Sequence, residues 1–138
     1  MTTHRATGPF DVKLLPVQSA ALEGQAELAS MSIDKQFHGA LEATSKGQML
    51  ACGGPSKGSG GYVAMERVTG ALDGRQGTFV LQHSATMNRG VPELSITVVP
   101  DSGTGELTGL TGKMGIQIAE GKHSYDFEYA LLAAQSPA

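Results

Sequence analysis

The chain has 138 residues, of which 40% are hydrophobic and 17% charged, a balance typical of one globular domain covering residues 1–138. The net charge is −3 and no basic tract is present. A nucleic-acid partner is therefore not expected, because phosphate binding needs clustered Lys or Arg. No stretch approaches the roughly 18 apolar residues of a membrane span, so no membrane partner is expected either.

Cysteine and histidine usage argues against several classes of site. Cys52 is the only cysteine, so an intrachain disulfide is excluded and a cytoplasmic location is the default expectation. His38, His83 and His123 lie on separate predicted strands with no short paired spacing, which disfavours a metal site. Residues 53–61 are glycine-rich but lack the order Gly-x4-Gly-Lys-Ser/Thr of a phosphate-binding loop. No cofactor is therefore expected, and 53–61 are predicted to form a loop at a barrel mouth.

Period-two alternation of apolar and polar residues recurs along the chain, as expected for strands. Nineteen glycines, about twice the average usage, punctuate the alternating runs. Pro16 should end the first strand or lie at a sheet edge, and residues 20–28 could hold a helical turn. Residues 1–8 and 133–138 are predicted to be frayed tails. The predicted strands lie near residues 9–17, 26–38, 40–52, 61–72, 75–87, 93–100, 106–118 and 122–132.

Asp73-Gly74, between two alternating runs, is a strong signal for a two-residue hairpin turn. With the turn centred there, Val68 faces Phe79 and Glu66 faces Leu81. One side of the hairpin is the more apolar and is predicted to point inward. Its residues are Tyr62, Ala64, Glu66, Val68, Phe79, Leu81, His83 and Ala85.

Glu120-Gly121 gives a second turn and a second register. On the outer face Lys113 then pairs with Glu128, an opposite-charge pair that suits a solvated surface. A slip of one residue would invert both faces and destroy the pattern. The predicted inner face carries His123, Tyr125, Phe127, Tyr129 and Leu131 opposite Ile118, Ile116, Met114, Gly112 and Leu110.

About eight meandering strands, each with one apolar face, must stack as a sandwich or close as a barrel. Closure removes the exposed edges, and a barrel of this size is filled by side chains or holds one small ligand. The predicted fold is therefore all-β, an antiparallel meander of about eight strands closed into a small barrel.

Several runs carry a family resemblance over nearly the whole chain. They are residues 61–70 (GYVAMERVTG), 72–83 (LDGRQGTFVLQH), 98–100 (VVP), 103–107 (GTGEL), 121–123 (GKH) and 125–127 (YDF). They resemble a bacterial family known only as a domain of unknown function. The resemblance implies a small antiparallel barrel similar to allene oxide cyclase and the dirigent proteins, usually oligomeric. It brings no established activity, and the catalytic residues of allene oxide cyclase are not matched.

Glu66 and His83 are the candidate catalytic pair. The first register makes them diagonal neighbours on one face, about 7–8 Å apart at the backbone and within reach of long side chains. Inside an apolar barrel a carboxylate and an imidazole can act as a general acid and base. The alternative is an internal hydrogen-bonded pair that only fixes the barrel register, since buried ionisable groups must be paired in either case.

Aromatic and histidine side chains on the two inner faces would give an apolar lumen with a few convergent polar groups, the usual build of a small-molecule site. The candidate ligand-binding residues are Tyr62, Phe79, His123, Tyr125 and Tyr129. The alternative is that the tyrosines fill the core and send their hydroxyls to the rim.

Three function classes follow. The first is a binding barrel for a small, largely apolar molecule. The second is an isomerase, cyclase or lyase using Glu66 and His83, and the third is an oligomeric scaffold with a filled barrel. Fold alone decides none of these, so enzymatic activity stays open. A homodimer or larger assembly is expected, because Val63, Met65 and Val80 on the outer face are too apolar for free solvent.

Overall fold

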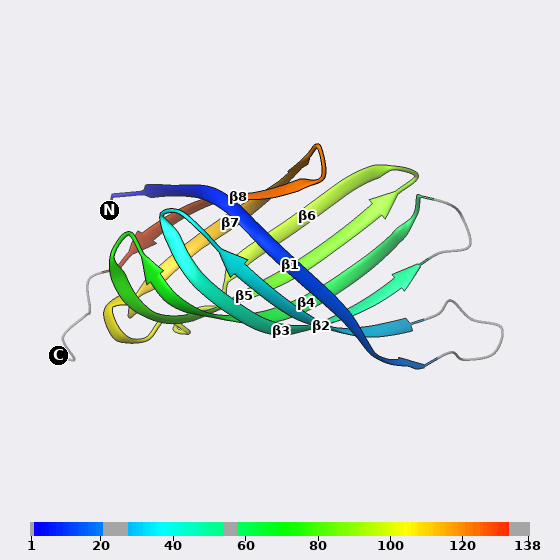
Figure 1. The fold of residues 1–138 in the computed structure, drawn as a ribbon, viewed down its shortest axis with the longest axis horizontal. Helices are drawn as coiled ribbons and strands as arrows, with labels where there is room; N and C mark the ends of the chain where they lie inside the picture. Colours follow the sequence, from blue (N-terminus) through cyan, green and yellow to red (C-terminus); the bar gives the residue numbers. More distant parts are fainter. Residues whose placement is uncertain (1, 21–27, 54–57, 133–138) are drawn as a thin grey trace.

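A computed structural model describes residues 2–20, 28–53 and 58–132. In it eight antiparallel strands follow one another around a closed barrel, and β1 pairs with β8 (Figure 1). This confirms the predicted all-β barrel. The strands are β1 (His4–Ala20), β2 (Leu28–Phe37), β3 (Leu41–Gly53), β4 (Gly60–Leu72), β5 (Arg75–Asn88), β6 (Val91–Val98), β7 (Leu110–Ala119) and β8 (Lys122–Leu131), and a short 3-10 helix, η1 (Gly105–Leu107), precedes β7.

Both predicted hairpin registers are confirmed. Asp73 and Gly74 take positive φ angles of 49° and 84°, as a two-residue turn requires, and Val68 pairs with Phe79. The turn at 120–121 has the same geometry, and Lys113 lies opposite Glu128. The face assignment is also correct, because the side chains on the predicted inner face of β4 and β5 are mostly buried. Glu66 and His83 are buried, whereas Arg67 and Gln82 are exposed.

The first strand is longer than predicted. His4 to Phe10 pair with β8, so the prediction of a frayed tail over 1–8 is wrong from His4 onward. The strand also continues past Pro16 to Ala20, with a register irregularity between Pro16 and Gln18. Beyond Phe10, β1 pairs only with β2. Pro16 therefore lies at a sheet edge, the position where its missing N–H is tolerated.

The connection between β6 and β7 differs most from the sequence prediction. A strand was predicted over 106–118, but β7 begins at Leu110. Gly105 and Gly109 have φ angles of +60° and +87°, a region that favours glycine and interrupts an extended chain. Between them Leu107 is buried in the barrel core. The connection therefore serves as a plug across this end of the barrel.

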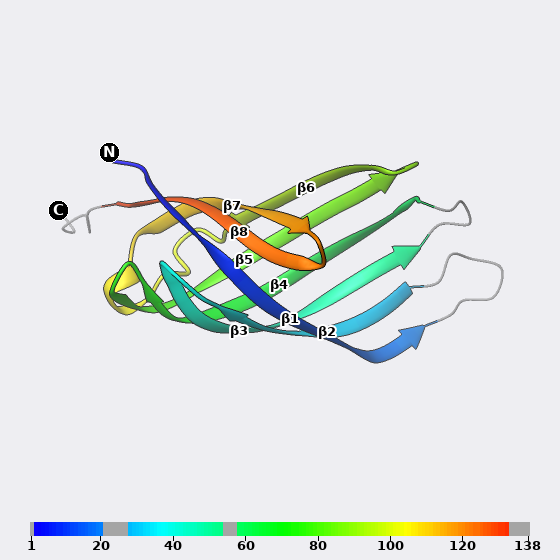
Figure 2. The same ribbon diagram turned by 45° about the horizontal axis from the view of Figure 1, so that its top comes forward.

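The two ends of the barrel are built differently (Figures 1 and 2). The closed end has the β2–β3 and β4–β5 turns, the plug and an aromatic core. That core includes Phe37, Leu41, Leu72, Phe79, Leu110, Phe127 and Tyr129. The open end has the hairpin ends of β1–β2, β3–β4, β5–β6 and β7–β8, of which β7–β8 (orange) stops short of the others.

The β6–β7 contact is a weak seam in the barrel. Within the residues described, a single backbone bridge, Thr97 with Lys113, joins these two strands. On the other side of β6, residues 91–98 all pair with β5. Backbone pairing in the described part of the barrel is therefore weakest at this seam.

Two predictions lie wholly or largely outside the described residues. These are the helical turn near 20–28, of which 21–27 are not described, and the loop at 53–61, of which 54–57 are not described. No helix in the described part of the chain is long and apolar enough to cross a membrane.

Candidate ligand-binding site

A cluster of four buried polar side chains crosses the barrel interior just below its open end. Lys35, Ser45, Glu66 and His83 come from four consecutive strands, β2 to β5. The Glu66 carboxylate is at the centre. Its Oε1 accepts hydrogen bonds from Lys35 Nζ at 2.9 Å and His83 Nε2 at 2.6 Å, and its Oε2 accepts one from Ser45 Oγ at 2.5 Å.

Strand register explains how residues on four strands meet. Lys35 lies directly opposite Ser45 on β3, and two residues further along β3 Gly47 lies opposite Glu66 on β4. Glu66 in turn is diagonal to His83 on β5, since its direct partner is Leu81. The long Lys35 side chain therefore has to pass over β3 to reach Glu66.

Gly47 allows Glu66 to approach β3 closely. A Cβ atom on Gly47 would lie 2.3 Å from the Met65 carbonyl oxygen and 2.7 Å from the Glu66 Cβ, well inside van der Waals contact. The missing side chain therefore leaves room for the backbone and Cβ of Glu66 beside β3. A glycine in a strand interior often marks such a close approach.

The environment keeps Glu66 ionised. Burial by itself raises the pKa of this carboxyl, but the hydrogen bond from His83, the charge of Lys35 and the bond from Ser45 together outweigh it. The resulting pKa is about 2, against an ordinary 4.5. An ionised carboxylate only accepts hydrogen bonds, so Glu66 is a counter-ion and anchor and not an available proton donor.

Lys35 is compensated on more than one side. Besides its bond to Glu66, its Nζ lies 5.2 Å from the centre of the Phe10 ring and 5.7 Å from that of Phe37, within the range of cation–π attraction. The charges of Lys35 and Glu66 cancel. The lumen at this level is therefore close to neutral despite its two ions.

One ring nitrogen of His83 is hydrogen-bonded to Glu66, and the other has a long contact alone. Because the Glu66 carboxylate can only accept, Nε2 carries the hydrogen of that bond, and in a neutral imidazole the lone pair is then on Nδ1. His83 Nδ1 lies 3.4 Å from the Tyr62 hydroxyl, a long contact. These two atoms are the polar groups of the site that are not hydrogen-bonded to Glu66.

A cavity of about 200 Å³ adjoins the cluster and is bounded by Lys35, Tyr62 and His83. An apolar cavity of about 150 Å³ is enough to hold benzene. The cavity is thus large enough for a small organic molecule. The remaining lining residues are mostly apolar: Phe10, Val12, Leu14, Ile33, Met49, Leu94, Ile116, Ile118 and His123.

A larger hollow, of about 310 Å³, lies along the β6–β7 seam and is bounded by Arg5, Lys113 and Asp126 among others. None of the four buried polar residues borders it, and Arg5 and Asp126 there already form an ion pair with each other. The cavity beside Glu66 is therefore the stronger candidate, because it combines apolar walls with convergent polar groups.

The predicted ligand-binding residues fall into two groups. Tyr62 and His123 border the cavity, and the His123 ring packs 5.3 Å from that of Phe10. Phe79 and Tyr129 instead flank Phe127 in the stack at the closed end. There the Tyr129 hydroxyl bonds the Asp73 carboxylate, and burial together with this anion raises its pKa to about 12.

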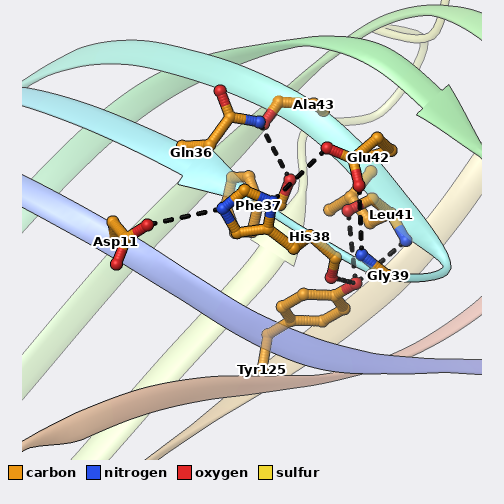
Figure 3. Close-up of polar contacts among 9 residues, drawn as sticks. All are labelled: Asp11, Gln36, Phe37, His38, Gly39, Leu41, Glu42, Ala43 and Tyr125. Carbon is orange, nitrogen blue, oxygen red and sulfur yellow. Dashed lines mark hydrogen bonds and ion pairs between the residues drawn. The ribbon is translucent and has the colours of Figure 1, made fainter.

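Tyr125 stabilises the β2–β3 turn (Figure 3). Its hydroxyl donates to the His38 carbonyl oxygen at 2.7 Å and accepts from the Leu41 N–H at 2.9 Å. On the outside of the same turn the His38 ring lies between the carboxylates of Asp11 and Glu42. Tyr125 is buried and does not border the cavity of about 200 Å³.

Comparison with known proteins adds a family to this geometry. The family model described as "Protein of unknown function (DUF3224)" matches residues 6–129. The chain belongs to this family. A crystal structure at 1.84 Å resolution of a DUF3224 protein of unknown function from Shewanella oneidensis MR-1 is 48% identical, with a TM-score of 0.91, over 96% of this chain and 100% of that one. No match was found among curated proteins.

Family membership thus identifies the fold and leaves the site to be interpreted from its residues. Sequence reasoning found Glu66 and His83 but missed Lys35 and Ser45. The alternation along β2 could have identified Lys35, because every second residue there, Ile33, Lys35 and Phe37, is buried. A lysine between two large apolar residues of the same parity points inward. No turn signal fixed the register between β2 and β3, so no partner for Lys35 could be predicted.

In the part of the chain that the structure describes, no three His, Cys, Asp or Glu side chains gather closely enough to hold an ion. At the cluster itself a lysine takes the place of a cation beside Glu66.

Proposed function

We propose that this barrel binds one small, neutral, largely apolar molecule in the cavity at its open end. The observation that carries the proposal is the cavity of about 200 Å³, with mostly apolar walls and with His83 and Tyr62 at its edge. A filled scaffold would not need such a space. Small-molecule sites typically combine an apolar wall with a few fixed polar groups.

The expected ligand carries one polar group. Glu66 already accepts three hydrogen bonds and does not border the cavity, so it is not expected to contact the ligand. The Tyr62 hydroxyl and His83 Nδ1, separated by a long 3.4 Å contact, are the atoms that can reorganise around a ligand oxygen. A neutral ligand is favoured because the Lys35 and Glu66 charges already balance.

The wider setting of the proposal follows from the sequence expectations. A cytoplasmic location is inferred from the lone Cys52. The resemblance to allene oxide cyclase and dirigent barrels supports a function located in the barrel lumen. No catalytic residue of allene oxide cyclase is carried over to this chain.

A thermal-shift screen tests this function. The compounds are neutral molecules of one or two rings that carry a single ketone or hydroxyl group. Binding to the native state raises the melting temperature by mass action. Wild type should respond to at least one of them, and Ile116→Trp, which fills the cavity, should not respond.

The matched control is Val91→Trp, which adds the same side chain at an exposed site outside the cavity and should keep the response. Equal shifts in wild type and Ile116→Trp would place binding elsewhere. The absence of any shift across the screen would favour the filled scaffold.

A further inference from the structure

The open end of the barrel brings a proton acceptor and a proton donor to one edge of the cavity. His83 Nδ1 and the Tyr62 hydroxyl project from neighbouring strands, β5 and β4, and lie 3.4 Å apart. We propose that the pair catalyses proton transfer at the carbon next to a carbonyl group, and so enolises a small neutral ketone or aldehyde. This inference rests on the proposed function, since the ketone is the bound ligand.

Glu66 prepares His83 to act as the base. A carboxylate bound to one ring nitrogen fixes the tautomer and ring orientation and stabilises the imidazolium that forms when the other nitrogen takes a proton. The 2.6 Å bond between Glu66 and Nε2 supplies this arrangement, and Nδ1 is left facing Tyr62 and the cavity. Glu66 is therefore a positioning residue.

Tyr62 is suited to hold the carbonyl oxygen. Burial, and next the nearby charge of Glu66, raise the pKa of its hydroxyl, so the group stays protonated and can donate. A donor aimed at an oxygen that becomes negative stabilises the transition state more than the ground state. The ring is half-buried, so its hydroxyl can turn from His83 to a ligand.

The step balances without a cofactor. The ligand C–H bond breaks and its proton moves to His83 Nδ1. The electron pair of that bond forms a carbon–carbon double bond, and the carbonyl π pair moves to the oxygen, which accepts a hydrogen bond from Tyr62. Return of the proton from His83 regenerates the ketone, or gives an isomer if the enol is conjugated and the proton reaches its far carbon.

Deuterium exchange measured by proton NMR tests the activity. Cyclohexanone, 2-heptanone and 1-indanone are incubated in D₂O buffer with and without protein, and loss of the signal of the protons next to the carbonyl is followed. Wild type should accelerate exchange over buffer for a ketone that also raises its melting temperature. His83→Asn should lower the rate about 100-fold, the usual contribution of a general base.

Tyr62→Phe should lower the rate by about 100-fold, as loss of one oxyanion donor does, while the ketone still raises the melting temperature. Tyr129→Phe removes a hydroxyl at the closed end and should leave the rate unchanged. Equal rates in wild type and both site variants would overturn the proposal.

Two further readouts separate the possible failures. A ketone that stabilises the protein without any exchange above buffer would overturn the catalytic inference and leave the binding function standing. If no ketone stabilises the protein and none exchanges faster than in buffer, both the binding function and the catalytic inference are wrong. Exchange that survives in His83→Asn, with ketone mass trapped on Lys35 by borohydride, would assign the chemistry to an imine and overturn the role given to His83.

The positioning role of Glu66 has its own spectroscopic test. Long-range ¹H–¹⁵N spectra should show the His83 ring protonated at Nε2 in wild type. In Glu66→Gln this tautomer preference should weaken together with the exchange rate. An unchanged tautomer with an unchanged rate would contradict the role.

Discussion

Glu66 on β4 and His83 on β5 are bonded at 2.6 Å although they are not opposite each other in the sheet. The imidazole has one nitrogen on the carboxylate and the other beside the Tyr62 hydroxyl at the cavity. The same carboxylate binds Lys35 from β2. With its bond from Ser45 on β3, this one side chain links four strands of the barrel, and it orients the imidazole of the buried cluster.

Removing the Glu66 charge should destabilise the fold. Glu66→Gln leaves Lys35 buried beside a neutral amide, and breaking a buried pair in this way costs about 3–5 kcal/mol. Urea denaturation should show this decrease in the free energy of unfolding. Glu128→Gln, at an exposed position, is the control and should change stability by less than about 0.5 kcal/mol. Similar effects of the two substitutions would contradict the buried cluster.

Stability should fall in acid because of the same residue. The pKa of Glu66 is about 2 in the folded chain, below its ordinary 4.5, so its contribution is complete above about pH 4.5 and is lost as the pH falls toward 2. The difference corresponds to about 3 kcal/mol. Denaturation curves between pH 6 and 2 should show this loss in wild type, and Glu66→Gln should lack that component.

Gly47→Ala should be severely destabilising, because the new Cβ would overlap the Met65 carbonyl oxygen and the backbone of Glu66. Overpacking of this kind typically costs about 1–3 kcal/mol, and more when the backbone must move. Gly115→Ala is the matched control, since its nearest neighbouring atom is 3.9 Å away. The melting temperature of Gly47→Ala should be well below that of Gly115→Ala. Equal decreases in melting temperature would show that the backbone of β4 does not approach Gly47 closely.

Tyr125→Phe should weaken folding by about 1–3 kcal/mol, because it removes the hydroxyl that satisfies the backbone of the β2–β3 turn. Ligand-induced shifts in melting temperature should be the same as in wild type, since Tyr125 does not border the cavity. A variant that folds normally but loses ligand response would return Tyr125 to the binding site.

We propose that the chain forms a homodimer or larger assembly. Val63 and Met65, two residues apart on the outer face of β4, are 52% and 51% exposed, and contiguous exposed apolar side chains mark interaction surfaces. Light scattering at micromolar concentration should give a multiple of 14.3 kDa. Met65→Lys should shift the protein toward the monomer, and a monomeric wild type would reject the proposal.

The sequence predicted the barrel and the Glu66–His83 contact because two turns set a register that alternation then extended. The Asp73-Gly74 pair is a local signal, and every pairing between β4 and β5 follows from it. The plug around Leu107 could not be found this way, because its course depends on packing against distant strands. The role of Gly47 was equally hidden, since it depends on the close approach of Glu66 on the neighbouring strand.

Because β6 meets β7 at one bridge in the described residues, most of one side of β6 is a sheet edge, as is β1 beyond Phe10. Such edges recruit strands from other chains, and proline or charged residues discourage this pairing. Pro92 and Glu93 both lie in β6 and are exposed. The edge of β6 is therefore a place where intermolecular strand pairing can start, and these two residues protect against it.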